Sequence, residues 1–196
     1  MLKASLAALL VATATVSGAA HAGLMDVKSV VITNALGEYL QVSEFQAFET
    51  GTGNNVALAT AGASASTTSG TWDGNSLPGK AIDGAYSNLG FPNMYHNASG
   101  TTGNLTITFA AQTELSSFTI YGRSDCCSNR DVYNVAFFDA DNQLLFTALS
   151  ANATGNTHAV NVELPNTDVP EPGSLALVGL GLAGLVARRK RQQAAR

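Results

Sequence analysis

The feature that most constrains the fold is a series of short apolar or alternating runs between residues 27 and 164. Each has the length of a strand, and polar turns rich in Asn, Asp and Gly separate several of them. No apolar repeat of helical period and useful length occurs before residue 170. Regularly spaced runs of this kind predict an all-β antiparallel sandwich or barrel. The expected strands are 27–33, 39–48, 105–109, 115–121, 132–139, 143–149 and 158–164.

One segment, residues 60–74, interrupts this series. It is rich in Ala, Ser, Thr and Gly, a composition typical of loops and connections. We expect a loop or a poorly ordered connection there, and its composition assigns it no chemical role.

The first 22 residues have the parts of a secretory signal peptide. Lys3 precedes an apolar run at 6–16, and Ala20-His21-Ala22 has the small-x-small pattern of a cleavage site. We therefore expect the mature domain to begin at Gly23, outside the cytoplasm.

The last residues form a three-part pattern. Pro170-Glu171-Pro172 precedes an apolar, glycine-rich run at 174–187, and four basic residues follow at 188–191. As a helix the run of 14 residues would span about 21 Å, against roughly 30 Å of hydrocarbon. A short membrane anchor with a basic stop is one interpretation. The order of the parts resembles a PEP-CTERM sorting signal at 169–196, as in Gram-negative bacteria that make exopolysaccharide, which implies transient membrane anchoring and cleavage by an exosortase-type protease.

The charge of the intervening domain, residues 23–168, is strongly negative. Lys28, Lys80, Arg123 and Arg130 are its only cations against thirteen carboxylates, a net charge of −9. Such a balance argues against a nucleic-acid partner. Both arginines lie in one octapeptide, RSDCCSNR at 123–130, together with both cysteines of the chain.

The two cysteines, Cys126 and Cys127, are adjacent. Because an exported protein meets an oxidising compartment, we expect a disulfide rather than a metal-binding thiol pair or a cysteine nucleophile. A bond between neighbours encloses almost no chain and requires a strained ring, so stability does not explain it. We interpret the pair as a rigid apolar tile between two cations, suited to a ligand with one apolar face and several hydroxyls, such as a sugar.

The spacing around this octapeptide is specific. His96 is followed by twenty-six residues, Arg123, one residue, Asp125, four residues and Arg130. This spacing resembles the fucose-binding signature of the F-type lectins, a branch of the discoidin-like, or coagulation-factor C-type, sandwich domains. Segments 80–84 and 118–122 resemble the same family. Segments 31–34 and 39–48 resemble its closing strands, which implies a discoidin-like jelly roll in circularly permuted order.

The resemblance implies a sugar site with a division of roles. The two guanidiniums would donate paired hydrogen bonds to adjacent hydroxyls, and neutral His96 would use one ring nitrogen on an axial hydroxyl. Asp125 would hold one guanidinium in place. The cysteine tile and an aromatic ring, Tyr95 or Phe91, would pack on the C–H face. An ordinary surface ion pair and a loop histidine are the alternatives. The candidate residues are His96, Arg123, Arg130, Cys126, Cys127, Asp125 and Tyr95.

The family also carries a structural calcium ion near the sugar, bound by two carboxylates and backbone carbonyls. Oxygen ligands of this kind suit Ca²⁺ and not zinc. The Lys80 ammonium would weaken such a site. Carried over by position, the candidate ligands are the carboxylates of Asp83 and Glu44, the carbonyls of Lys80, Ala85 and Ser43, and Asn93 where the family often has serine.

Three classes of function follow from these features. The first is an exported, non-catalytic lectin for fucose or a fucose-like sugar on glycans or exopolysaccharide. The second is a glycoside hydrolase using Asp83, Asp125 or Asp131, but their spacing does not distinguish them from surface acids. The third is a matrix or adhesion protein that has the same fold without fucose binding. The sequence favours the first.

Overall fold

The computed structural model describes residues 23–98 and 103–166, and these form an antiparallel all-β structure without an α-helix. The all-β fold class is therefore confirmed. The predicted signal peptide and sorting segment lie outside the described residues. The strands are β1 (Leu24–Asn34), β2 (Gln41–Val42), β3 (Glu44–Glu49), β4 (Ser64–Ser66), β5 (Tyr95–His96), β6 (Asn104–Tyr121), β7 (Val132–Phe138), β8 (Leu144–Asn152) and β9 (Ala159–Glu163); the 3₁₀ turns are η1 (Ala59–Ala61), η2 (Pro78–Ile82) and η3 (Ser128–Arg130).

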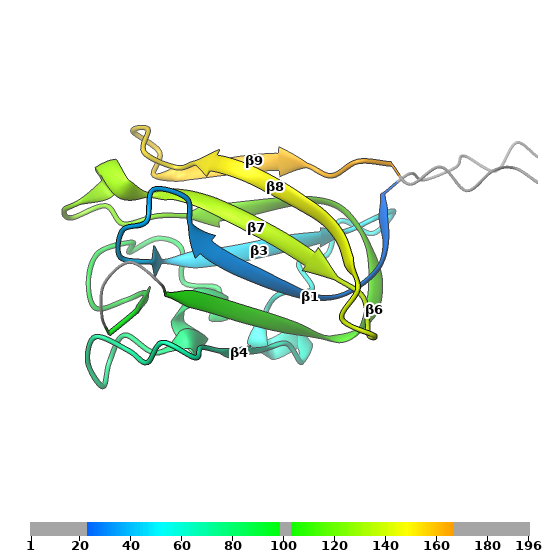
Figure 1. Ribbon diagram of the computed structural model, residues 1–196, viewed down its shortest axis with the longest axis horizontal. Coiled ribbons are helices and arrows are strands. Elements are labelled where there is room, and N and C mark those ends of the chain that lie inside the picture. The colour runs from blue at the N-terminus through cyan, green and yellow to red at the C-terminus, as the bar shows by residue number, and fades with distance from the viewer. Residues whose placement is uncertain (1–22, 99–102, 167–196) are drawn as a thin grey trace, which may run out of the picture.

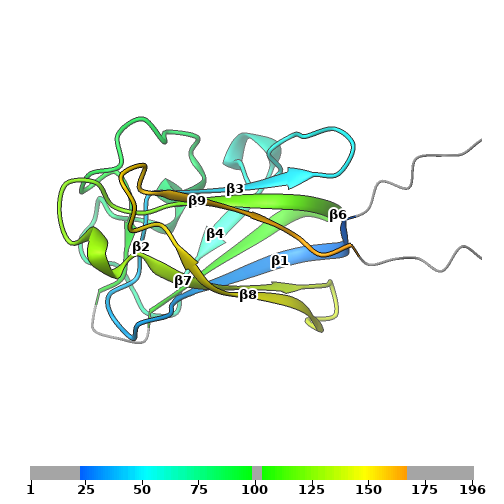
Figure 2. The same ribbon diagram turned by 90° about the horizontal axis from the view of Figure 1, so that it is seen from above.

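One long strand, β6, belongs to both layers of the structure (Figure 1). Its first half pairs with β1 and β4, and β1 in turn pairs with β7 and β7 with β8. Its second half pairs with β3 on one side and β9 on the other. In the view of Figure 2, β3 and β9 form one layer, in the upper part of the picture, and β1, β7 and β8 form the other, in the lower part. This is a sandwich whose two sheets share a strand.

The expectation of two strands at 105–109 and 115–121 was wrong in one respect, because a single strand covers both. The joining residues 110–112 are exposed. They remain extended because β1 continues to pair beyond them, with Val27 opposite Thr113 and Leu24 opposite Leu115. Register shifts in β1 absorb the bend.

The hydrophobic core lies between the two layers. Alternation along the strands places Ile32 of β1 and Phe137 of β7 inside from one layer, and Phe45 of β3 and Phe118 of β6 inside from the other. The Phe118 and Phe137 rings are 5.5 Å apart, and those of Phe45 and Phe118 are 5.7 Å apart. Each such fully buried side chain stabilises the fold by about 1.5–3 kcal/mol.

The segment 60–74 is more ordered than its composition indicated. It contains β4, which pairs with β6 at the edge of the sheet. Just after β4, the Thr67 hydroxyl lies 2.6 Å from the Tyr95 hydroxyl and donates to the Asn104 carbonyl at 2.7 Å. Local composition did not reveal this order because the partners are distant in the chain.

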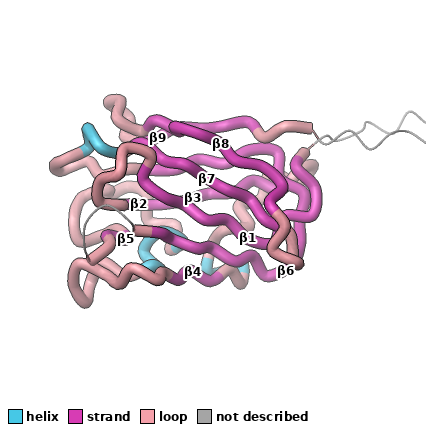
Figure 3. Tube along the Cα trace, viewed as in Figure 1, coloured by secondary structure: helices cyan, strands magenta, loops and turns pink. Residues whose placement is uncertain are grey.

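The β1–β2, β6–β7 and β8–β9 connections gather at one end of the sandwich, near the short β2–β5 pair (Figure 3). The described chain begins and ends at the other end, since Leu24 pairs with Leu115 and the Leu164 amide donates to the Ser116 carbonyl. Neighbouring chain ends are the condition under which a permuted strand order is tolerated. The permutation itself stays a prediction.

Candidate functional site

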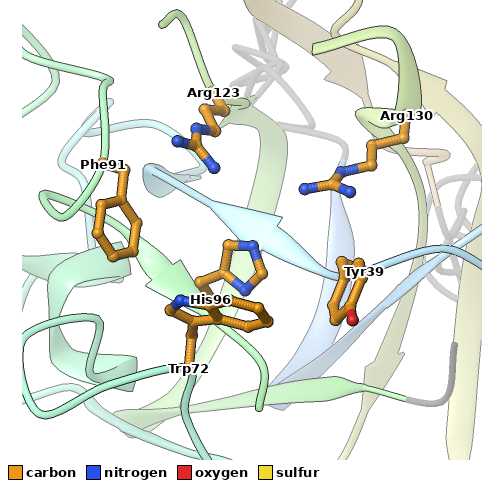
Figure 4. A pocket seen from close by; sticks show the side chains of 6 residues that line it. All are labelled: Tyr39, Trp72, Phe91, His96, Arg123 and Arg130. Atoms are coloured by element: carbon orange, nitrogen blue, oxygen red, sulfur yellow. The ribbon is translucent and has the colours of Figure 1, made fainter. Parts of the chain in front are cut away.

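Six side chains line a cavity of about 370 Å³ at the loop end of the sandwich (Figure 4). They come from three connections between strands and from β5, so the cavity exists only in the folded chain. Its volume falls in the range of small-molecule sites. The lining residues are Tyr39, Trp72, Phe91, His96, Arg123 and Arg130. Three of them, His96, Arg123 and Arg130, are the residues on which the sequence spacing rests.

His96 is held in one tautomer. Its Nδ1 lies 2.9 Å from the Asn97 carbonyl oxygen, which can only accept, so Nδ1 carries the proton. The neutral ring therefore keeps Nε2 as an acceptor. Burial lowers the pKa of His96, and the charges of Arg130 and Arg123 lower it further. His96 thus offers an acceptor between two donors at neutral pH.

Arg123 is fixed by a two-pronged ion pair. Its Nε donates to Asp125 Oδ1 at 2.6 Å and its Nη2 to Oδ2 at 3.0 Å. This hydrogen bonding holds the pKa of Asp125 at about 2. The guanidinium also lies 5.3 Å from the centre of the Phe91 ring. Only 13 % of the Arg123 side chain is exposed, so the pair orients a cavity wall and is more than a surface ion pair.

Arg130 is held differently, through a neutral amide. Its Nη2 donates to Gln41 Oε1 at 3.1 Å, and its guanidinium lies 5.2 Å from the centre of the Tyr39 ring. Gln41 Nε2 donates in turn to Asp131 Oδ1 at 2.7 Å. Among the described residues Arg130 Nε is buried and has no acceptor. Arg130 is therefore oriented while most of its N–H groups remain available.

Asp131 is fully buried and ends the hydrogen-bond relay that runs from Arg130 through Gln41. Its Oδ2 accepts from the Arg123 amide at 2.7 Å. Burial raises the pKa of Asp131 to about 6, although these hydrogen bonds oppose the shift. A side chain at position 122 would collide with the Asp131 carboxylate, so Gly122 is required for this close approach. Asp131 thus connects the backbone amide of Arg123, through the Gln41 side chain, to the side chain of Arg130.

The aromatic rings of the cavity include two that sequence reasoning missed, Tyr39 and Trp72. The Trp72 ring lies 5.2 Å from His96 and the Tyr39 ring 5.4 Å from it, while Phe91 meets His96 edge-on at 6.4 Å. Trp72 is 54 % exposed and is held by a 2.8 Å hydrogen bond from its amide to the His96 carbonyl. A signal existed, because Trp72 is the only tryptophan of the chain and lies in an otherwise small-residue segment.

Tyr95 does not line the cavity, contrary to expectation. It is fully buried, and its hydroxyl donates to the Asn104 carbonyl at 2.8 Å. Neighbouring residues of a strand point to opposite faces, so His96 faces the cavity while Tyr95 faces inward. The expected C–H face is instead lined by Phe91, Tyr39 and Trp72.

The cysteine pair also differs from expectation. Cys126 and Cys127 are free and exposed, and neither lines the cavity. Cys127 has a left-handed backbone, with φ of 58°, at the start of η3. A hydrogen bond between the two thiols raises the pKa of Cys126. The adjacent thiols lie on the outer rim, and their oxidation to a disulfide stays a prediction.

Two of the predicted metal ligands, Glu44 and Asp83, lie side by side. Glu44 is fully buried and both of its oxygens accept from the Gly84 amide, at 3.2 and 3.3 Å. Burial raises the pKa of Glu44 to about 8, and the Asp83 charge contributes to the rise. Lys80 Nζ is 3.8 Å from Asp83 Oδ2 and competes for it. A buried carboxylate next to a second one fits an oxygen-binding cation such as Ca²⁺.

The other predicted ligands make hydrogen bonds of their own, mostly outside the Glu44–Asp83 pair. The Ser43 hydroxyl donates to the Leu89 and Gly122 carbonyls, and the Ala85 amide donates to Asp83 Oδ1 at 2.9 Å. The Asn93 amide donates to the Gly90 carbonyl. No group of three or more His, Cys, Asp or Glu side chains suited to a metal occurs within 23–98 and 103–166. Any ion here would depend on two carboxylates and carbonyl oxygens.

Comparison with known proteins concerns the end of the chain. A family model described as the PEP-CTERM protein-sorting motif matches residues 168–191. The chain carries a PEP-CTERM sorting motif. This motif indicates export and sorting to the cell envelope or surface, typical of Gram-negative bacteria, with processing by an exosortase-type system. Comparisons with curated proteins and with solved structures gave no match.

The place where the PEP-CTERM motif joins the domain is defined by β9. The motif begins two residues after the last described residue, 166, and Leu164 is bound to Ser116 of β6. From Ser116 to Gly122, where the cavity connection starts, β6 advances about 20 Å at roughly 3.3 Å per residue. Leu164, near the end of the described chain, and the cavity therefore lie at opposite ends of the sandwich. No helix in the described part of the chain is long and apolar enough to cross a membrane.

Proposed function

We propose that the domain is a non-catalytic carbohydrate-binding module of an exported envelope protein, and that its cavity binds fucose or a fucose-like sugar. The observation that carries this proposal is the convergence of His96, Arg123 and Arg130 in one aromatic-lined cavity. The same three residues match the spacing of the F-type lectin signature. The PEP-CTERM motif, which indicates sorting to the cell envelope or surface, supports the proposal, because glycans and exopolysaccharide would be ligands for a module exported there.

The polar groups of the cavity suit adjacent hydroxyls. Each guanidinium is a planar fork of donors, and neutral His96 supplies an acceptor at Nε2. One hydroxyl can donate to Nε2 while its oxygen accepts from a guanidinium, which satisfies both groups. The rings of Trp72, Tyr39 and Phe91 offer apolar faces to the C–H bonds and the methyl group of the sugar.

The two carboxylates that support the cavity arginines, Asp125 and Asp131, are engaged in ways that favour binding over hydrolysis. Glycoside cleavage uses two carboxyl groups that flank the scissile bond. Asp125 is engaged by Arg123 through both oxygens, and Asp131 is fully buried behind Gln41. Both therefore support the arginines.

We further propose that Glu44 and Asp83 hold a calcium ion, with carbonyl oxygens of neighbouring residues. When bound, the ion would neutralise two adjacent carboxylates and link the turn that follows η2 to the start of β3. Calcium at about 100 times its Kd should then raise the free energy of unfolding by about 2.7 kcal/mol. We would measure urea unfolding in calcium, magnesium and EDTA, with Glu44→Gln as the test variant and Asp141→Asn in the exposed β7–β8 turn as control. Equal stability in calcium and EDTA would contradict the calcium site.

The sugar proposal is tested by calorimetric titration of the exported protein with L-fucose. Saturable heat is expected for the wild type, with loss in Arg123→Ala and retention in Lys28→Gln, which removes a cation from β1. Binding of the bacterium's own exopolysaccharide without any binding of L-fucose would favour the matrix or adhesion alternative. Binding of neither would contradict both.

A further inference from the structure

A second cavity, of about 480 Å³, adjoins the first. Its lining is Leu36, Glu38, Cys127, Asn129 and Arg130. Arg130 lines both cavities, so its side chain is their common wall. Nothing in the sequence signature assigns a role to Leu36, Glu38 or Asn129.

The wall formed by Leu36 and Glu38 is held in place by Asn34. The Asn34 side-chain oxygen accepts from the Leu36 amide at 2.8 Å and from the Glu38 amide at 3.1 Å. The Asn34 side-chain nitrogen donates to the Arg130 carbonyl at 2.7 Å. One asparagine thus ties the β1–β2 connection to the β6–β7 connection. A wall ordered in advance lowers the entropy cost of binding.

Like the first cavity, the second combines hydrogen-bonding side chains with an apolar surface. The exposed Glu38 carboxylate accepts hydrogen bonds, and the exposed Asn129 amide both donates and accepts. Leu36, 55 % exposed, provides an apolar edge. These groups complement a ring that carries several hydroxyls and a C–H face. Binding of a polyanion is disfavoured by Glu38 and by the net charge of −9 over residues 23–168.

Arg130 separates the two cavities as a common wall, and it also has hydrogen-bond donors that could serve both. Of its five N–H groups, one has an acceptor among the described residues, Gln41 Oε1. Its Nε is buried without an acceptor. A guanidinium between two cavities, with most donors free, can bond hydroxyls on both sides.

We infer that the second cavity binds the sugar residue next to the one held in the first, so that the ligand is an oligosaccharide or polysaccharide chain recognised through at least two consecutive units. This inference rests on the proposed function, because the first cavity must hold a sugar for the second to hold its neighbour. Terminal and penultimate units would then both contribute to affinity, and their linkage would determine specificity.

The test compares one sugar unit with two. We would titrate the exported protein by calorimetry with methyl α-L-fucoside and with L-fucose in every α-linkage to galactose and to N-acetylglucosamine. At least one disaccharide is expected to bind about tenfold tighter than the methyl glycoside. Leu36→Ser and Asn129→Ala should each reduce that gain while leaving methyl fucoside affinity unchanged. Leu149→Ser, which removes a leucine that is 73 % exposed on β8, is the matched control and should change neither.

The outcomes separate the two proposals. If methyl fucoside binds but no disaccharide gains more than about twofold, or if the gain survives in both Leu36→Ser and Asn129→Ala, the second subsite is overturned and the sugar site stands. If neither the methyl glycoside nor any disaccharide binds, the proposed function fails, and this inference fails with it.

Discussion

Arg123 and Arg130 line the same cavity, but the protein holds their charges in different ways. Arg123 is paired directly with Asp125, whose side chain is 46 % exposed, and this pair uses both Nε and Nη2. Arg130 is oriented by the neutral amide of Gln41, which the buried Asp131 holds. The direct pair makes Arg123 a fixed wall, whereas the relay leaves Arg130 as the freer donor. Two chemically identical side chains thus play different roles, because a carboxylate holds Arg123 and a neutral amide holds Arg130.

The two supporting aspartates differ as strongly as the arginines do. Asp125 is exposed, and its hydrogen bonds to Arg123 hold its pKa at about 2. Asp131 is fully buried, and burial raises its pKa to about 6. An exposed carboxylate can be removed at small cost to stability, whereas a buried acceptor of several hydrogen bonds cannot.

The largest effect is therefore expected at Asp131. Asp131→Ala should lower the free energy of unfolding by about 3–5 kcal/mol, because it leaves one N–H of the Gln41 side chain and the backbone N–H of Arg123 without an acceptor. Asp125→Ala is the matched control and should cost less than about 1 kcal/mol. Urea unfolding of both variants would measure the difference. Equal losses would show that burial does not separate the two aspartates.

The next largest effect is expected at Arg130. Arg130→Ala should weaken L-fucose binding about 100-fold, since hydrogen bonds from a charged donor contribute about 1.5–3 kcal/mol. Arg130→Lys should recover little, because an ammonium lacks the planar fork. Calorimetry would check both variants beside Lys28→Gln. A smaller loss for Arg130→Ala than for Arg123→Ala would reverse the assignment of Arg130 as the freer donor.

A smaller effect is expected when the direct ion pair is broken. Asp125→Ala should weaken L-fucose binding about tenfold, because Arg123 keeps its charge but loses the partner that orients it. Asp125→Asn should recover part of the loss, since its amide oxygen still accepts one hydrogen bond. Unchanged affinity in Asp125→Ala would mean that Phe91 alone holds the guanidinium.

The smallest effect is a pH dependence located at His96. The folded-state pKa of His96 is lowered below 6.5, so the folded ring stays neutral until the pH falls below that value. Protonation then removes the Nε2 acceptor and adds a third positive charge. L-Fucose affinity should be flat from pH 8 to 7 and fall a few-fold at lower pH. His96→Asn should flatten the profile, and an unchanged profile in that variant would place the titrating group elsewhere.

Stability is a less suitable measure of His96, because Asp131 acts in the opposite direction. A lowered histidine pKa contributes stability that is lost as the pH falls below 6.5. A raised aspartate pKa contributes stability that is present below the ordinary value of 3.8 and is lost as the pH rises through about 6. The two contributions overlap in acid, so ligand affinity separates them better than unfolding does.

Much of the strand pattern could be predicted from the sequence. The runs at 132–139 and 143–149 correspond to β7 and β8 because alternation is a local signal. The sequence could not predict that β6 is one continuous strand or that β4 exists, because both features depend on pairing with residues far along the chain. Low local signal in 60–74 therefore concealed an edge strand and the tryptophan that follows it.

The candidate site shows the same limit. The linear spacing was sufficient to single out His96, Arg123 and Arg130, and the structure brings them together in one cavity. Gln41 and Tyr39 carry no signal in that spacing, since Gln41 holds Arg130 from β2 and Tyr39 lines the cavity from the connection before β2. Tyr95 shows that proximity in sequence is misleading, because one step along a strand reverses the direction of a side chain.

The sequence by itself determined the all-β class and the PEP-CTERM motif, because strand alternation and a contiguous motif are written in neighbouring residues. Only the tertiary structure decided which aromatic rings meet His96, how each arginine is held, and that the cavity and Leu164 lie at opposite ends of the sandwich. These properties depend on which distant segments share a face. Burial and long-range pairing decide that, and neither can be read from one stretch of chain.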